Sequence, residues 1–409
     1  MSDNGITGAS PQGRIVKICL TGGPCGGKTS IQVALCDMFE NLGWKVFRVP
    51  ETATILLGAG VSWYDLTGEE AKLFQMHLLK VMLNIEDTFT SVASSMIKRG
   101  LNVLILCDRG TMDPGAYIPR PEWISILSEL NMDELLLRDQ RYDLVLHLMT
   151  SAIGAEKFYT MATNEARYES LENARDVDRA LANAWVGHPN YALIDNSTDF
   201  ETKKLRAFEA ILTRVGLSDT RFGKGIVKKK YLLMPSAATS VDKGLAIKTP
   251  ASYASIDEAV VFPAEISFRD FDVRHDYLIS TDDSTTRIRR RGFSSSSSYS
   301  ITQQKTVNGE RVEVRRILSP KEYELFLSQT DPSHCPIIKK RRCFLWKERY
   351  YQIDLFESPN PGLLLLEAYV VPSPNCTTDS EKKDLPPFLN VSKDITGEKA
   401  YSMFHLSSI

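Results

Sequence analysis

The chain has 409 residues, 43% of them hydrophobic, and a formal net charge of −2, which predicts two or three globular domains with ordinary cores. No apolar run is long enough to cross a bilayer, so we expect no transmembrane segment. Residues 224–349 carry 23 Lys and Arg against 15 Asp and Glu, whereas the remainder carries 26 against 36. This asymmetry indicates two domains with different partners, the basic one binding an anion.

The seven cysteines are scattered, odd in number and never spaced as C-x-x-C. This usage indicates reduced thiols, a cytoplasmic location and no zinc knuckle. Residues 1–14 are polar and lack the apolar core of a signal peptide, so we expect a flexible N-terminus there.

A P-loop pattern, G-x-x-x-x-G-K-T, follows an apolar run typical of a buried strand and precedes apolar residues at helical spacing. Backbone N–H groups at a helix N-terminus favour an anion, and glycines let the backbone approach phosphates closely. We expect Lys28 to bind the outer phosphates of GTP or ATP and the Thr29 hydroxyl to bind Mg²⁺. The predicted nucleotide site comprises Gly22, Gly23, Pro24, Cys25, Gly26, Gly27, Lys28, Thr29 and Ser30.

Residues 15–218 alternate apolar strands with helical patterns, which predicts a P-loop domain with a parallel sheet covered by helices. Asp108 directly follows an apolar strand, where a carboxylate holds Mg²⁺ through water. Glu51 ends the strand before it, at the edge where such sheets bind ligands. Glu51 could contact substrate or metal-bound water, or could instead only meet the helix dipole. Lys28, Asp108 and Glu51 are the candidate catalytic residues.

Three further residues are candidates for nucleotide binding. Arg167 and Arg175 lie at helical spacings, as in the lids of kinases, although a solvated, ion-paired helix face explains the same pattern. Asn196 follows the last predicted strand and could approach a base. No Asn-Lys-x-Asp stretch is present to specify guanine, so GTP and ATP both stay open.

From residue 224 the pattern changes to short strand-like runs separated by turns, which predicts an antiparallel β domain over 224–409 with an insertion near 235–260. The serine run Ser294–Ser298 is expected to be a loop tip. Arg287, Arg289 and Arg291 recur at period two, so they share one face of a strand. If the sheet closes into a barrel, that face is a lumen suited to a polyanion; otherwise it is a solvated outer face.

The segments GGPCGGKTS, CDRG, LRDQRYDLVLHLMTSAIGAEKFYT and AWVGHPNYALIDNSTDF resemble the NadR/TTD-type P-loop proteins. That branch includes the ribosylnicotinamide kinases and the TRPL translocation defect proteins. The second group is the better match, because the similarity covers nearly all of residues 15–216 and continues beyond them.

The order of the basic and strand-like segments in the second half resembles the CYTH, or triphosphate tunnel, fold. In that family, basic side chains bind phosphates while carboxylates hold a divalent metal. The resemblance implies an anion or lipid site made of Lys228, Lys230, Arg287, Arg289, Arg291, Lys305, Arg311, Arg315, Lys339 and Arg341. Lys228 and Arg315 stand where the family has glutamates, which leaves only Glu313, Asp354 and Glu367. We therefore expect a binding module that has lost metal catalysis.

The combined hypothesis is a GTP- or ATP-binding regulatory protein whose β domain binds phosphoinositide or phosphatidic acid. It would couple nucleotide state to protein trafficking, with a membrane-protein cargo, and would be cytoplasmic and peripherally membrane-associated, without nucleic acid. The first alternative is a nucleoside-type small-molecule kinase. The second alternative is a triphosphatase in the β domain, for which the ligand set is incomplete.

Overall fold

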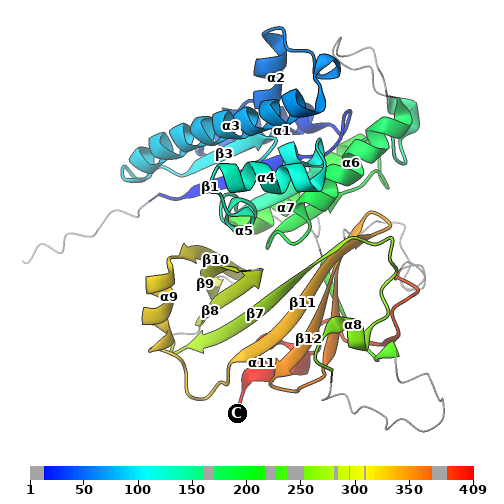
Figure 1. Cartoon of the computed structure of the whole chain (residues 1–409). Helices are drawn as coiled ribbons and strands as arrows, with labels where there is room; N and C mark the ends of the chain where they lie inside the picture. The colour runs from blue at the N-terminus through cyan, green and yellow to red at the C-terminus, as the bar shows by residue number, and fades with distance from the viewer. Residues whose placement is uncertain are drawn as a thin grey trace, which may run out of the picture. The chain divides into compact units, whose positions relative to one another are not determined.

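The computed structural model describes residues 13–159, 170–217, 227–236, 253–280, 284–293, 295–307, 310–370 and 385–409 (Figure 1). The chain divides into two compact units, Met1–Trp185 and Val186–Ile409. Most of the expected N-terminal segment and of the expected insertion near 235–260 lies outside the described residues. Among the described residues, no helix is long and apolar enough to span a membrane.

The first sheet has five strands in the order β2–β3–β1–β4–β5, and its pairs β2/β3, β3/β1 and β1/β4 are parallel. The strands are β1 (Ile15–Thr21), β2 (Lys45–Val49), β3 (Val103–Asp108), β4 (Leu144–Leu148) and β5 (Tyr191–Ile194). In the central strand β1, Ile18, Cys19 and Leu20 are fully buried, which explains why this part of the strand is apolar. Lys17 of the same strand is also buried, and it is paired with Glu86 at 2.6 Å. The predicted parallel sheet is therefore confirmed.

In the part of the chain that the structure describes, seven α-helices accompany this sheet: α1 (Lys28–Asn41), α2 (Thr52–Gly58), α3 (Gly68–Ile97), α4 (Arg120–Glu129), α5 (Glu134–Asp139), α6 (Leu171–Trp185) and α7 (Phe200–Val215). Short 3₁₀ turns cover Trp63–Asp65, Asp113–Ala116 and Glu156–Phe158. The long helix α3 starts with a capping box between Thr67 and Glu70, which satisfies otherwise unpaired N–H groups. Its buried side, including Leu78 and Met82, recurs at helical spacing.

The second sheet has nine strands in the order β10–β9–β8–β7–β11–β12–β13–β6–β14, and the pairs resolved along it are antiparallel. The strands are β6 (Val227–Leu233), β7 (Phe268–Leu278), β8 (Ser284–Phe293), β9 (Ser296–Val307), β10 (Glu310–Leu318), β11 (Ile337–Trp346), β12 (Arg349–Ser358), β13 (Leu364–Val370) and β14 (Val391–Asp394). Short helices α8 (Ile256–Ala259), α9 (Pro320–Leu327) and α11 (Met403–Ser407) and the 3₁₀ turn Lys399–Tyr401 accompany it.

Two expectations for this unit need correction. Within the described strands, β10 and β14 are the two edges of an open sheet, so the barrel that we predicted is not seen. The serine run is not a loop tip throughout, because Ser296–Ser298 pair with β8 as the first residues of β9.

Residues of β7 and β8 alternate between two faces. Ile288 and Leu278 pack with Leu318 and Tyr323 in an apolar cluster. Residues at the alternate positions of these strands, such as Arg287 of β8 and His275 of β7, point to the opposite face. That polar face is where the predicted anion-binding residues gather.

Candidate functional site

The P-loop packs against the carboxyl end of β4. A Cβ atom on Gly22 would lie 2.1 Å from the carbonyl oxygen of Leu148, and one on Gly26 would lie 2.4 Å from the same atom. Gly22 and Gly27 also have φ angles of 123° and 88°, which side chains disfavour. Glycine is therefore required at these positions for the loop to lie this close to the sheet.

Lys28 is the first residue of α1 and is 9% exposed. Its ammonium donates to the carbonyl oxygens of Gly22 and Gly23, each at 2.7 Å. Thr29 and Ser30 are exposed at the same helix start. The P-loop thus gathers a lysine, a hydroxyl and a helix N-terminus at one place, which is the chemistry that phosphate binding needs.

Glu51 and Arg109 form an ion pair beside the loop. Arg109 Nε donates to Glu51 Oε1 at 2.9 Å, and Arg109 Nη1 donates to the Gly22 carbonyl at 2.8 Å. Burial opposes ionisation of Glu51, but Arg109, Thr54 and Lys28 together lower its pKa to about 2. Arg109 has a φ of 76°, a backbone strain that often marks functional sites. Glu51 is therefore a charged acceptor at physiological pH.

Asp108 ends β3, and its Oδ1 is buried without a hydrogen-bond partner in the described part of the chain. Burial raises the pKa of Asp108 above its usual value, although the charge of Lys28 opposes this. An orphaned carboxylate oxygen suits a water-bridged cation, so Asp108 and the Thr29 hydroxyl fit the predicted Mg²⁺.

Three further residues were predicted to bind the nucleotide: Arg167, Arg175 and Asn196. Arg167 lies outside the described residues. Arg175 donates to the Ala152 carbonyl at 2.7 Å, and Asn196 accepts from Lys203 at 2.7 Å. Their contacts with a nucleotide stay predictions.

Two residues that the sequence did not single out as site residues contact the loop itself. Asp178 accepts from the Gly23 N–H, and the Thr150 hydroxyl donates to the Pro24 carbonyl at 2.5 Å. A carboxylate on the apolar side of α6 was the available signal for Asp178. Nothing in the pattern around Thr150 pointed to it.

In the second unit, four arginines form what we call the arginine cluster: Arg287, Arg289, Arg291 and Arg315. The register sets Arg289 of β8 opposite His275 of β7. Arg289 Nη2 is buried and has no hydrogen-bond partner within the described ranges. Burial and the charges of its arginine neighbours lower the pKa of Arg289 well below its usual value. Like charges this close are unfavourable without an anion near them. Burial opposes ionisation of Glu313, but the charges of Arg287 and Arg289 help to lower its pKa, so this carboxylate offsets part of the positive charge of the cluster.

His275 is affected by the same positive charges. It is 4% exposed, and neither ring nitrogen has a hydrogen-bond partner among described residues. Burial, followed by the charges of Lys339, Arg287 and Arg289, lowers its pKa well below the usual value. His275 therefore stays neutral and adds no charge to the arginine cluster.

Asp354 and Glu367, the paired carboxylates, are engaged by other cations. Asp354 is fully buried and accepts from Lys339 Nζ at 2.7 Å and from Arg341 Nε at 2.6 Å. Lys228 lies 2.7 Å and Lys230 3.8 Å from Glu367. Across the described chain, no group of three His, Cys, Asp or Glu side chains could hold a metal ion. Both carboxylates are therefore already paired with basic side chains.

Two predicted ligands lie on strands whose ends are incompletely described. Lys305 pairs with Ser284 in β8, and Arg311 of β10 pairs with Thr306. Their side chains lie outside the described residues, so their part in anion binding stays a prediction.

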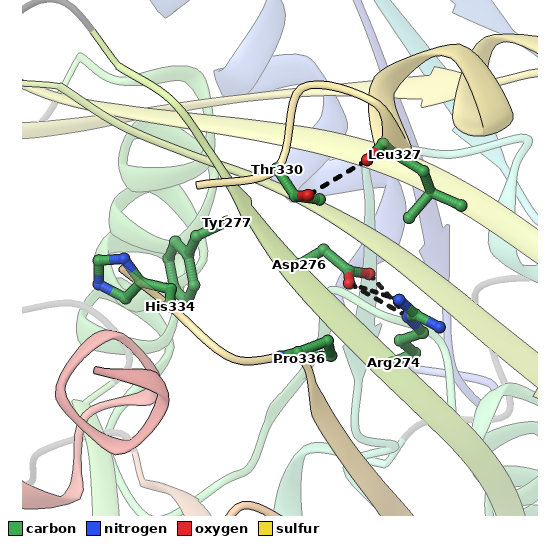
Figure 2. Close-up of a pocket in the computed structure, with 7 residues that line it drawn as sticks. All are labelled: Arg274, Asp276, Tyr277, Leu327, Thr330, His334 and Pro336. Atoms are coloured by element: carbon green, nitrogen blue, oxygen red, sulfur yellow. Dashed lines mark hydrogen bonds and ion pairs between the residues drawn. The ribbon is translucent and has the colours of Figure 1, made fainter. Parts of the chain in front are cut away.

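A pocket of about 190 Å³ lies elsewhere on this unit (Figure 2). Asp276 there is buried and accepts from Arg274 at 2.8–3.1 Å and from the Tyr323 hydroxyl at 3.3 Å. The two charges compensate each other, so this pocket has no surplus charge for a phosphate. Its lining comprises Arg274, Asp276, Tyr277, Leu327, Thr330, His334 and Pro336, none of them a predicted site residue.

The parallel sheet, the glycine loop and the lysine at the start of α1 define a P-loop nucleotide-binding domain. Residues 17–203 match the protein family described as "AAA domain", which supports a P-loop NTPase domain in that part of the chain. No curated protein matches the sequence.

Several solved structures are similar to part of the chain. Thymidylate kinase from Ehrlichia chaffeensis is 16% identical, with a TM-score of 0.31, over 48% of this chain and 98% of its own. The hypothetical protein NE1496 is 17% identical, with a TM-score of 0.29, over 44% of this chain and 97% of its own. PH1819 protein from Pyrococcus horikoshii OT3 is 13% identical, with a TM-score of 0.24, over 39% and 85% respectively. Similarities at this level carry no information on activity.

Proposed function

We propose that the P-loop domain binds GTP or ATP with Mg²⁺, and that the arginine cluster binds the phosphorylated headgroup of an anionic phospholipid. Nucleotide state would then be coupled to membrane recruitment and to the trafficking of a membrane-protein cargo. The proposed lipid binding rests mainly on Arg289. Its guanidinium has a buried nitrogen without a hydrogen-bond partner among the described residues, and it lies among other arginines. Phosphate oxygens are the acceptors that such a guanidinium prefers.

The paired carboxylates support binding without metal. Because Lys339, Arg341 and Lys228 neutralise Asp354 and Glu367, a divalent ion would have to displace ammonium and guanidinium groups.

For the nucleotide half, Lys28, Thr29 and Asp108 would hold the phosphates and Mg²⁺, and the bound ion would neutralise phosphate charge. Changing Lys28 to alanine is expected to weaken binding of Mg²⁺–GTP or Mg²⁺–ATP by roughly 10- to 100-fold, because a charged contact to the outer phosphates is lost. Titrating both nucleotides into wild type and variant by calorimetry measures this loss and the base preference. Lys45→Ala, an exposed lysine on β2, is the matched control. Equal affinity of wild type and Lys28→Ala would contradict the assignment.

A second candidate function is phosphoryl transfer to a small nucleoside-type molecule. It is favoured by Asp108, whose pKa is raised by burial beside the charged Glu51–Arg109 pair. A partly buried carboxylate at the end of a strand beside the P-loop is placed to act as a general base for an acceptor hydroxyl.

In this second function, Asp108→Asn should lower the rate of nucleoside phosphorylation by at least about 100-fold. The assay follows phosphorylated nucleoside by chromatography with ATP or GTP as donor. Asp133→Asn, at the exposed start of α5, is the control. If wild-type protein forms no product with any of the common nucleosides, the kinase function is refuted and the regulatory function is unaffected.

A further inference from the structure

Asp178 stands out because a carboxylate occupies the buried side of α6. The side consists of Ala174, Asp178, Leu181, Ala182 and Trp185, and Asp178 is 1% exposed. A buried, ionised carboxylate is costly unless strong donors surround it. The donors around the Asp178 carboxylate therefore show which segments it connects.

Three donors from two other segments surround this carboxylate. Asp178 Oδ1 accepts from the backbone N–H of Gly23 at 2.6 Å and from that of Thr150 at 3.0 Å. Oδ2 lies 3.1 Å from Nε2 of His147, which is fully buried in β4. Burial opposes the charged form, but these partners keep the pKa of Asp178 below its usual value. One side chain thus joins α6, the end of β4 and the start of the P-loop.

The same stretch of P-loop holds the lysine. The Lys28 ammonium donates to the carbonyl oxygens of Gly22 and Gly23, so its place depends on the orientation of these peptide groups. Gly23 is packed closely against the same residues, since a Cβ there would lie 2.9 Å from Asp178 Oδ1 and 3.1 Å from Thr150 Cβ. A continuous chain of contacts therefore runs from Asp178 through Gly23 to Lys28.

We propose that Asp178 is a positioning residue of the phosphate site, which fixes the Gly22–Gly23 backbone and through it the Lys28 ammonium. The inference rests on the proposed nucleotide binding and adds a residue that the P-loop pattern does not contain. It also makes α6 part of the phosphate site, although no side chain of this helix needs to contact the nucleotide.

The test compares Mg²⁺–GTP and Mg²⁺–ATP affinities of full-length variants by calorimetry. Asp178→Ala leaves two N–H groups unpaired in the interior, so affinity should fall roughly tenfold. Asp178→Asn should recover most of that loss, since its amide oxygen still accepts from Gly23 and Thr150 while its NH₂ donates to His147. Asp176→Ala, on the same helix but with a side chain that is 67% exposed, should match wild type.

A double-mutant cycle separates positioning from general damage to the domain. If Asp178 acts through Lys28, Asp178→Ala should change affinity by less than about twofold in a Lys28→Ala background. A tenfold effect in both backgrounds, or none in either, would overturn the proposal. If Asp178→Ala does not fold, Asp178→Glu, which displaces the carboxylate by one methylene, provides the same comparison. Wild-type protein that binds neither nucleotide would refute the proposed function itself, a separate and visible outcome.

Discussion

Reversing the charges of Arg287 and Arg289 is expected to abolish binding to vesicles that contain phosphatidic acid or a phosphoinositide. Each basic residue near an anionic surface contributes about 1 kcal/mol, and two reversals change the site by four charges. The expected loss is therefore about 4 kcal/mol, or roughly a thousandfold in affinity. Flotation at physiological salt, with neutral phosphatidylcholine vesicles as the reference, measures it.

The matched control reverses Arg290 and Arg316 instead. Both side chains are exposed, and Arg290 lies on the opposite face of β8, so the control has the same net charge without altering the arginine cluster. Competition by tripolyphosphate separates a lipid headgroup from a free polyphosphate as ligand. Vesicle binding that survives the Arg287/Arg289 reversal, or that both double variants lose equally, would contradict the lipid site. Turnover of tripolyphosphate with Mg²⁺ or Mn²⁺ would contradict our interpretation of the paired carboxylates.

Changing Asp354 to alanine is expected to destabilise the second unit by about 3–5 kcal/mol, because a buried ion pair loses its anion. Burial already lowers the pKa of Lys339 to about 8, so this lysine can release its proton in the variant. Arg341 cannot, and it would keep only Glu367, 3.5 Å away, as a counter-charge after losing both of its hydrogen bonds to Asp354. Urea unfolding followed by far-UV circular dichroism measures the loss. Asp272→Ala, with an 82% exposed side chain, should stay within about 0.5 kcal/mol of wild type.

The two buried carboxylates, Asp354 and Glu367, also predict how the stability of the second unit depends on pH. The folded-state pKa values of Asp354 and Glu367 are depressed, that of Glu367 to about 2. A depressed carboxyl pKa contributes stability above the unfolded-state value of about 4, and that contribution disappears as the pH falls toward the folded value. Wild-type stability should therefore decline between about pH 4 and pH 2 more steeply than that of Asp354→Ala. Equal slopes for the two proteins would rule out this contribution.

The first sheet and the P-loop could be predicted because local pattern and tertiary environment agree there. β1 is mainly apolar and its residues Val16–Thr21 are buried, and Gly22 and Gly26 lie where no Cβ fits. Asp178 could not be recognised as a loop contact in the same way. Its neighbours Asp176 and Arg179 are exposed, and the pattern of α6 shows only that Asp178 lies on the apolar side of the helix, not that this side contacts the P-loop.

The second unit could be predicted only in part. Alternation placed Arg287, Arg289 and Arg291 on one face correctly, because side-chain direction in a strand is a local property. Whether the two edge strands of a nine-stranded sheet meet depends on pairing between distant segments, which no local pattern specifies. The prediction of a loop tip over the serine run was wrong for a related reason. The pairing of Ser296–Ser298 with β8 outweighs their loop-like composition.

The order of strands in the first sheet also bears on synthesis of the chain. β1 pairs with β3 and β4, with Ile15 opposite Val103 and Ile18 opposite Leu144. β1 therefore has no strand to pair with until β3 has been made, and the glycine loop has no Leu148 carbonyl to rest on until β4 follows. The nucleotide site cannot assemble during synthesis before β4 has left the ribosome.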